Sequence, residues 1–252
     1  MEKISRRQFV KMGIFTTAGV FVGSFFAFAD TEKNIEIKSY DDLLKFDWGY
    51  IVDSSRCIGC GACVRACKTE NKVPEKYFRT WVERYEVNKD EKIKVDSPNG
   101  AAESFKQNNF ESSEIVKSFF VPKICNHCYD SPCVQVCPVG ASYISPDKVV
   151  LIDKKHCVGC GYCVQACPYA CRYMDHEKGT ADKCTYCYHR IHKGIPPACV
   201  NACPRNARMY GNLKDPDSKI HKVLHQNRYG VLKPDLGTNP KCYYLEIDME
   251  IK

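Results

Sequence analysis

The sequence of 252 residues predicts an α+β fold in which two small cysteine-rich units are nested, one inside the other. Sixteen of its 18 cysteines fall into four groups of four, and two of these groups repeat one pattern at an offset of 100 residues. A short β-like run stands directly before each of the two repeated groups. The apolar content other than cysteine is modest, so bound metal is expected to contribute to the free energy of folding.

The four cysteine groups have the number of thiols that four iron–sulfur clusters require. Groups one and three both read C-x2-C-x2-C-x3-C, the spacing typical of bacterial ferredoxins that carry 4Fe–4S clusters. Sixteen thiolates in four sets are the ligands of four 4Fe–4S clusters. In chain order the groups are Cys57, Cys60, Cys63 and Cys67; Cys125, Cys128, Cys133 and Cys137; Cys157, Cys160, Cys163 and Cys167; and Cys184, Cys187, Cys199 and Cys203.

The fourth cysteine of each group is expected to bind a different cluster from the first three. In two-cluster ferredoxins the fourth thiolate ligates the partner cluster. Groups two and three are neighbours in the chain and groups one and four flank them, so the simplest pairing inserts one ferredoxin-like unit into another. The predicted ligand sets are Cys57, Cys60, Cys63 and Cys203; Cys184, Cys187, Cys199 and Cys67; Cys125, Cys128, Cys133 and Cys167; and Cys157, Cys160, Cys163 and Cys137.

Zinc and disulfides are the alternatives to iron. Structural zinc sites use pairs of C-x2-C motifs without the tight third cysteine, so a zinc-binding structural protein is the remote alternative. Cysteines three residues apart in one tight loop are poor disulfide partners. Cys171 and Cys242 are left over and are predicted to be free thiols. Cys171 could replace a ligand, but packing beside a cluster is the preferred interpretation.

Residues 1–29 predict an export signal of the twin-arginine type. "SRRQFVKMG" at 5–13 has the paired arginines, an uncharged stretch follows, and "AFA" at 27–29 resembles a cleavage site. This route exports folded proteins, so clusters can be inserted before export. We expect an extracytoplasmic location, periplasmic or pseudoperiplasmic, with association to the membrane through partners or through a retained N-terminal helix.

The elements are expected in a regular order along the chain. "WGYIVDSSRC" and "KVVLIDKKHC" predict strands before groups one and three, "YFRTWVERYEV" predicts another strand, and a short helix is expected between the third and fourth cysteine of each group. "DPDSKIHKVLHQN" predicts a short helix with Pro216 near its first turn, and "KCYYLEI" predicts a final strand. The expected divisions are an outer unit at 48–87 and 182–215, an inserted surface loop at 88–120, an inner unit at 121–181 and a C-terminal extension at 216–252.

The formal net charge of +7 does not indicate binding to nucleic acid. The basic residues are scattered, and no run of lysine or arginine stands out. Several anionic clusters would outweigh the excess of positive charge. We therefore expect no nucleic-acid partner.

The order of the cysteine groups resembles a known family. "CNHC…PC…CP" in group two and "KC..C..R…G..PAC…CP" in group four are similar to the iron–sulfur electron-transfer subunits of complex iron–sulfur molybdoenzymes, from about residue 48 onward. Some members replace the third cysteine of group two, but here Cys133 is present. The segments "FRTWVERYE", "VDSPNG", "VPKICNHCYDSPCVQVCPVGASY" and "CPYACRYM" most resemble DsrO, the periplasmic ferredoxin-like subunits of DsrMKJOP membrane complexes.

The resemblance implies electron transfer rather than catalysis. A DsrO-like subunit is expected to relay electrons between a quinone-linked integral membrane subunit of the NrfD type and a multihaem cytochrome c. The alternative is the iron–sulfur subunit of a periplasmic molybdopterin reductase such as tetrathionate reductase, whose partner is the molybdopterin catalytic subunit. The sequence has no nucleotide-binding glycine motif and no acid–base constellation, so no catalytic residue is predicted and the chain is not expected to be an enzyme by itself.

Overall fold

A computed structural model describes residues 39–247 of the chain. Contacts divide the chain into a unit of residues 1–34 and a unit of residues 35–252, and the described residues belong to the second unit. The export signal predicted at 1–29 lies outside the described residues. Between residues 39 and 247 no helix has the length and apolar character needed to cross a membrane.

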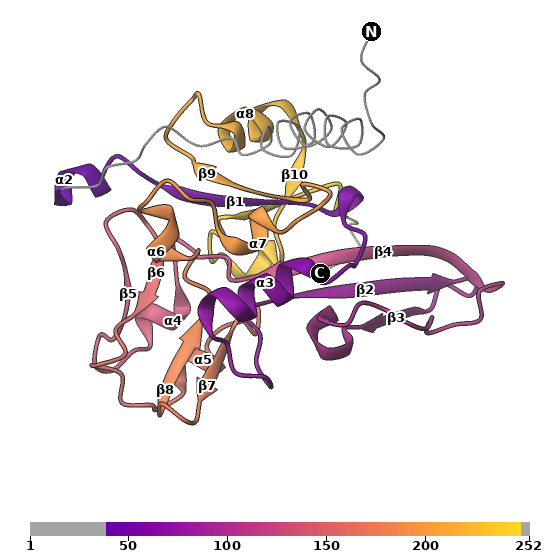
Figure 1. Cartoon of the computed structure of the whole chain (residues 1–252), viewed down its shortest axis with the longest axis horizontal. Coiled ribbons are helices and arrows are strands. Elements are labelled where there is room, and N and C mark those ends of the chain that lie inside the picture. Colours follow the sequence, from indigo (N-terminus) through magenta and orange to yellow (C-terminus); the bar gives the residue numbers. More distant parts are fainter. Residues whose placement is uncertain (1–38, 248–252) are drawn as a thin grey trace, which may run out of the picture. The chain divides into compact units, whose positions relative to one another are not determined.

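A four-stranded sheet joins the two ends of the described chain (Figure 1). Its strand order is β10 (Tyr229–Gly230), β11 (Cys242–Leu245), β1 (Trp48–Asp53) and β9 (Arg208–Asn212). β1 pairs antiparallel with β9 and parallel with β11. Because β1 precedes group one and β9 follows group four, this pairing brings the first and last cysteine groups together.

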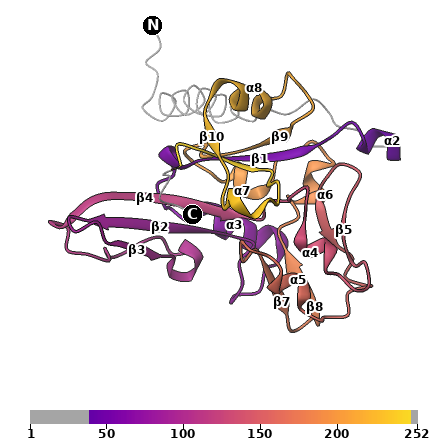
Figure 2. The same cartoon turned by 180° about the vertical axis from the view of Figure 1, so that it is seen from behind.

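β1 is buried on both of its faces, which explains its nearly continuous apolar sequence. Trp48, Tyr50 and Val52 point into the main core. Ile51 points to the other face, where it packs in a small core with Ile220 of α8 (Lys219–Gln226). The helix α8 lies beside β1 and β9 in both views (Figure 2). The side chain of Ser218 caps this helix by accepting a hydrogen bond from His221 N, so the predicted helix begins after Pro216 rather than around it.

The segment 88–120 is not simply the surface loop that we expected. It contains β3 (Ile93–Asp96), the short 3-10 turn η2 (Pro98–Ala101) and most of β4 (Ile115–Ile124). These strands pair with β2 (Thr80–Asn88), in the order β3-β2-β4 (Figure 1). β3 is mostly exposed, and ion pairs join residues of β2 and β3 within this sheet.

Arg84 is at the centre of these ion pairs. This buried side chain in β2 lies 2.8 Å from Asp96 of β3 and 3.2 Å from the buried Glu86. Asn109 adds hydrogen bonds to Asp96 and, through its backbone N–H, to Glu86. Polar residues that satisfy one another can therefore form the interior of this sheet.

Two small hairpins separate the later cysteine groups. β5 (Ser142–Ile144) pairs with β6 (Val150–Ile152) between groups two and three, and β7 (Arg172–Asp175) pairs with β8 (Thr180–Lys183) between groups three and four. In both views the two hairpins lie together, away from the far end of the β2–β4 sheet (Figures 1 and 2). Each hairpin ends close to a cysteine group and so holds that group in place.

A short helix covers the stretch from the third cysteine towards the fourth in every group, as expected. These helices are α3 (Ala62–Asn71), α4 (Pro132–Gln135), α5 (Tyr162–Gln165) and α7 (Ala198–Asn201). The remaining short turns are α2 (Tyr40–Leu43), η1 (Ser54–Arg56), α6 (Tyr188–Ile191) and η3 (Pro234–Leu236). The described fold is thus α+β with short strands, short helices and long connections.

Candidate iron–sulfur centres

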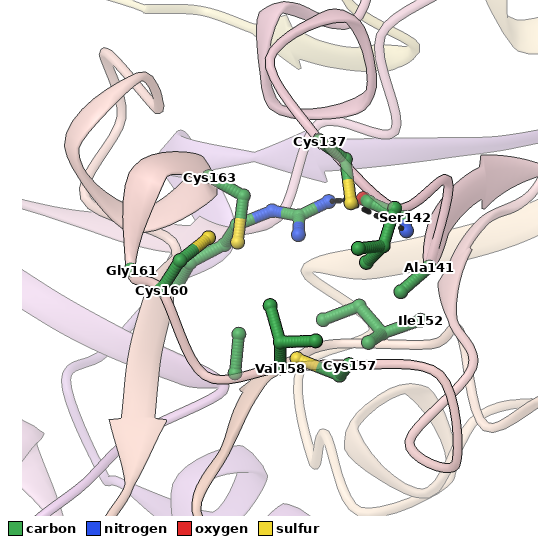
Figure 3. A pocket seen from close by; sticks show the side chains of 12 residues that line it. Cys137, Ala141, Ser142, Ile152, Cys157, Val158, Cys160, Gly161 and Cys163 are labelled. Atoms are coloured by element: carbon green, nitrogen blue, oxygen red, sulfur yellow. Dashed lines mark hydrogen bonds between the residues drawn. The ribbon is translucent and has the colours of Figure 1, made fainter.

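One cavity is lined by three cysteines of group three and the last cysteine of group two. The sulfur atoms of Cys157, Cys160, Cys163 and Cys137 face the same central space (Figure 3). The backbone N–H of Ser142 donates to Cys137 Sγ at 3.4 Å. The four thiols around this group-three cavity are those of one predicted ligand set.

Two further cavities are lined in the same way. The group-one cavity is lined by Cys57, Cys60, Cys63 and Cys203, and the group-two cavity by Cys125, Cys128, Cys133 and Cys167. The empty volumes of the three cavities are nearly equal, at about 340, 330 and 330 Å³ for groups three, one and two. In each cavity the fourth sulfur comes from a different group, in the exchange that the spacing predicts.

The remaining set is the most deeply buried. Cys184, Cys187, Cys199 and Cys67 are all buried. Asn71 Nδ2 lies 3.6 Å from Cys67 Sγ and 3.6 Å from Cys187 Sγ, which places the last thiol of group one beside group four. The hydroxyl of Tyr50 lies 3.2 Å from Cys199 Sγ.

Glycines with positive φ precede the helices inside the repeated motifs. Gly61 has φ +68° at the N-terminus of α3, and Gly161 has φ +77° at that of α5. L-amino acids other than glycine reach this conformation only at a cost. Each glycine lets the chain turn sharply between the second and third cysteines, so that their sulfurs face one cavity.

Burial disfavours the thiolate form of several of these cysteines. The pKa of Cys57 is raised to about 11 and that of Cys128 to about 12, mainly by burial, with neighbouring cysteine sulfurs acting in the same direction and hydrogen bonds opposing them. A set of four thiolates therefore requires compensating positive charge and hydrogen bonds. An iron core supplies positive charge inside such a set.

Three of the four fourth cysteines, Cys137, Cys167 and Cys203, accept hydrogen bonds from the backbone that follows them. Ala207 N donates to Cys203 Sγ at 3.2 Å, as Ser142 N does to Cys137 Sγ. The pKa of Cys167 is lowered to about 6. The main cause is a hydrogen bond from the Cys171 thiol to its sulfur, nearby backbone N–H groups act in the same direction, and burial opposes them. The chain thus stabilises negative charge on these sulfurs.

Two buried arginines face the cavities, and our sequence analysis missed them. Arg172 borders both the group-three and the group-two cavity, and Arg208 borders the group-one cavity. Arg172 Nε and Nη1 and Arg208 Nη2 have no hydrogen-bond partner within residues 39–247. Buried cations with unpaired N–H groups beside four sulfurs match an anionic cluster well.

An aromatic pair lies between the inner and outer units. The ring of His127, from group two, stacks on the ring of Tyr186, from group four, with centroids 3.7 Å apart. His127 Nδ1 accepts a hydrogen bond from Val150 N at 3.0 Å. Burial, together with the charges of Lys183 and Lys241, lowers the pKa of His127 well below its usual value, so the ring is neutral.

Cys171 and Cys242 are both buried. Cys171 Sγ lies 3.2 Å from Ile124 O and 3.3 Å from Tyr169 O, at the edge of the group-two cavity. Cys242 lies in β11 within the main core. All 18 cysteines are among the described residues, and none of them forms a disulfide there.

The chemistry of the sites fits 4Fe–4S clusters. Four sulfur donors surround each cavity, backbone N–H groups point at the sulfurs, and buried guanidinium groups lie beside them. Within residues 39–247, no group of three or more His, Cys, Asp or Glu side chains is arranged to hold a single metal ion.

Comparisons with known proteins agree with this chemistry. Two families, each described as a 4Fe–4S dicluster domain, match residues 116–213 and 56–141. A tetrathionate reductase subunit of Salmonella typhimurium is 40% identical over 246 residues, which cover 97% of this chain and 89% of that subunit. One of the polysulfide reductase chains of Wolinella succinogenes is 37% identical, covering 78% and 92%. The Hdr-like menaquinol oxidoreductase iron–sulfur subunit 1 of Archaeoglobus fulgidus is 32% identical, covering 98% and 100%.

Proposed function

Because the protein belongs to the family of 4Fe–4S dicluster iron–sulfur subunits that includes these tetrathionate reductase and polysulfide reductase components, we propose that it relays electrons through four 4Fe–4S clusters. Members of this family are electron-transfer components of oxidoreductase complexes and not their catalytic subunits. The observation that carries the proposal is the gathering of sixteen thiols from distant parts of the chain into four sets.

We propose the four predicted ligand sets as the cluster ligands. The shared lining of three cavities and the contacts of Asn71 with Cys67 and Cys187 support these sets. Groups one and four thereby form one two-cluster unit, and groups two and three form the other. The clusters supply one-electron redox chemistry, while the chain holds their ligands, excludes water and sets the local charge.

The proposed relay is a linear row of centres. The outer unit contains the group-one and group-four centres, and the inner unit the group-two and group-three centres. The stacked pair of His127 and Tyr186 lies where group four meets group two, so these two centres are the middle of the row. The cysteines of the middle centres are almost all buried, whereas Cys160 at the group-three end is exposed and Cys60 at the group-one end is half-buried. This difference supports electron entry and exit at the two ends.

The partner that the comparisons favour is a molybdopterin catalytic subunit. The match to the tetrathionate reductase subunit extends over 97% of this chain, which supports a role as the iron–sulfur subunit of such a reductase. The second candidate is a Dsr-type complex with an NrfD-type quinone-interacting membrane subunit and a multihaem cytochrome c. The match over the full length of a menaquinol oxidoreductase iron–sulfur subunit supports this candidate. For both we propose an extracytoplasmic location and export by the twin-arginine route.

Anaerobic purification of the complex after gentle detergent extraction tests these proposals. About sixteen irons and as many acid-labile sulfides per chain are expected, with clusters that reduce without any added substrate. Zinc in place of iron, or a colourless iron-free preparation, would contradict the relay. Molybdopterin in the co-purifying subunits supports the reductase, and c-type haem supports the Dsr-type complex.

A further inference from the structure

We propose that Arg172 and Arg208 are shared counter-charges, each placed between the two clusters of one unit, and that each raises the reduction potentials of both clusters in its own unit. The inference rests on the proposed function, because it requires clusters at the four cysteine sets. It assigns these two arginines a role in setting the reduction potentials of the clusters. The spacing of the cysteines does not reveal this role.

The surroundings of the four buried arginines distinguish these two from the others. Arg79 pairs with Asp182 at 2.8 Å, and Arg84 pairs with Asp96 and Glu86. Arg172 and Arg208 are buried to the same extent but form no ion pair with a carboxylate in the described part of the chain. A buried cation without a counter-charge is strongly disfavoured, so these two guanidinium groups require an anion beside them.

Arg172 lies between the two cavities of the inner unit. It borders the group-three cavity and also the group-two cavity. Its Nη2 donates to Ser142 Oγ at 2.8 Å, and Ser142 N in turn donates to Cys137 Sγ. Its Nε and Nη1 have no partner within residues 39–247. This one guanidinium group therefore lies next to thiols of both inner ligand sets.

Arg208 has the corresponding position in the outer unit. It borders the group-one cavity, and its Nη1 donates to the Tyr50 hydroxyl at 3.4 Å. That hydroxyl contacts Cys199 Sγ of the other outer set. Through Tyr50, Arg208 is therefore linked to both outer ligand sets.

The two arginines also occupy equivalent positions in the sequence. Arg172 follows Cys167 by five residues and is the first residue of β7, and Arg208 follows Cys203 by five residues and is the first residue of β9. The same offset after Cys67 and Cys137 leads to Lys72, which is exposed, and to Ser142. Each unit therefore places one buried arginine five residues after a fourth cysteine, in its C-terminal half.

The effect on potential follows from charge. When a cluster with four thiolates accepts one electron, no bond forms or breaks, and its net charge changes from about −2 to about −3. A fixed positive charge in a dry site stabilises the more negative state more strongly. Arg172 borders both inner cavities, and Arg208 borders the group-one cavity and reaches Cys199 of the other outer set through Tyr50. Removal of either arginine is therefore expected to affect the two clusters of its own unit and leave the other two unchanged.

The test is a redox titration of the purified full-length protein, followed by electron paramagnetic resonance with dithionite as reductant. In Arg172→Gln, reduction of two of the four clusters is expected to become roughly tenfold less favourable, which is about 59 mV for one electron. Arg208→Gln is expected to shift the other two clusters. The control is Arg228→Gln, because Arg228 is exposed to solvent and borders none of the three cavities, and so should shift none of them.

Iron content and the Arg→Lys variants complete the test. Lysine keeps the positive charge, so lysine variants with potentials close to those of the unaltered protein support the proposal. If a glutamine variant loses iron, retention of iron in the corresponding lysine variant also supports it. The proposal is overturned if the glutamine variants keep sixteen irons with unchanged potentials, or if all four clusters shift alike. Loss of iron in both the lysine and glutamine variants would also overturn it, by showing a need for the shape of arginine rather than its charge. Lack of clusters in the unaltered protein would instead refute the proposed function.

Discussion

The hydroxyl of Tyr50 lies 3.2 Å from Sγ of Cys199, a contact between residues 149 positions apart in the chain. Tyr50 is fully buried in β1, and its oxygen already accepts a hydrogen bond from Arg208 Nη1. When Cys199 is a thiolate ligand, the hydroxyl must act as the donor. The first strand of the described fold thus contributes a hydrogen bond to a centre built mainly from group four.

Tyr50→Phe is expected to lower the reduction potential of one cluster. The change removes one O–H···S hydrogen bond and keeps the ring, so iron content should not change. A hydrogen bond worth about 1 kcal/mol to the reduced state corresponds to a shift on the order of 40 mV. Redox titration measures the shift, and Tyr85→Phe, which removes a hydroxyl that donates to Glu83 and borders none of the three cavities, is the control. Unchanged potentials in Tyr50→Phe would exclude this hydrogen bond from any role in reduction.

Gly61→Ala is expected to be much more destabilising than Gly161→Ala, although the two glycines occupy the same place in the repeated motif. Both have positive φ, which costs alanine about 1–2 kcal/mol. A Cβ at Gly61 would also lie 1.8 Å from Ala101 O, whereas one at Gly161 meets nothing within 4 Å. Thermal unfolding under argon, with iron analysis, compares the two variants. Equal losses would mean that the contact with Ala101 has no effect on stability.

Cys171→Ser is expected to retain about sixteen irons per chain, because Cys171 lies against backbone carbonyls at the edge of the group-two cavity. Cys167→Ala, four residues earlier, removes a proposed ligand and should reduce the iron content by about four atoms. Iron and sulfide analysis of both variants distinguishes a packed thiol from a ligand. Loss of a cluster in Cys171→Ser with retention in Cys167→Ala would reverse the assignment.

Asp96→Asn is expected to destabilise the β2–β4 sheet by about 1–2 kcal/mol at neutral pH. Burial alone would raise the pKa of Asp96, but hydrogen bonds from Arg84 and Asn109 outweigh it and hold the pKa below its usual value. A carboxyl group with a lowered pKa contributes stability above its unfolded pKa of about 4, and loses that contribution as the pH falls through the folded value. The difference between the two proteins should therefore be constant from pH 7 to pH 6 and shrink below about pH 4.

Denaturant unfolding at several pH values measures this difference. Asp90→Asn is the control, because Asp90 is exposed and its contact with Lys92 is long, at 3.8 Å. It should change the free energy of unfolding very little. A difference between Asp96→Asn and the unaltered protein that increases as the pH falls would contradict the assigned role of the ion pair.

The cysteine spacing predicted local structure well because each motif contains its own geometric constraints. The strand before Cys57, the strand before Cys157 and the short helices after the third cysteines all lie where the motifs predict them. β3 escaped prediction because it has only four residues, most of them exposed, and its Asp96 depends on Arg84 of the neighbouring strand. Burial of Arg172 and Arg208 was missed for a similar reason, since a single arginine gives no sign of what surrounds it. Their common offset of five residues from a fourth cysteine was the available signal.

The central position of β1 has a consequence for the order of assembly during synthesis. β1 is hydrogen-bonded to β9 on one edge and to β11 on the other, so its neighbours emerge from the ribosome last. Likewise, the proposed ligand set of the group-one centre is complete only when Cys203 has been synthesised. The N-terminal half of the outer unit therefore cannot complete its fold before the C-terminal half has been synthesised. A prematurely terminated chain would expose the first three thiols of group one next to β1, an apolar strand without its neighbours. Complete translation is in this way a precondition for a closed outer unit.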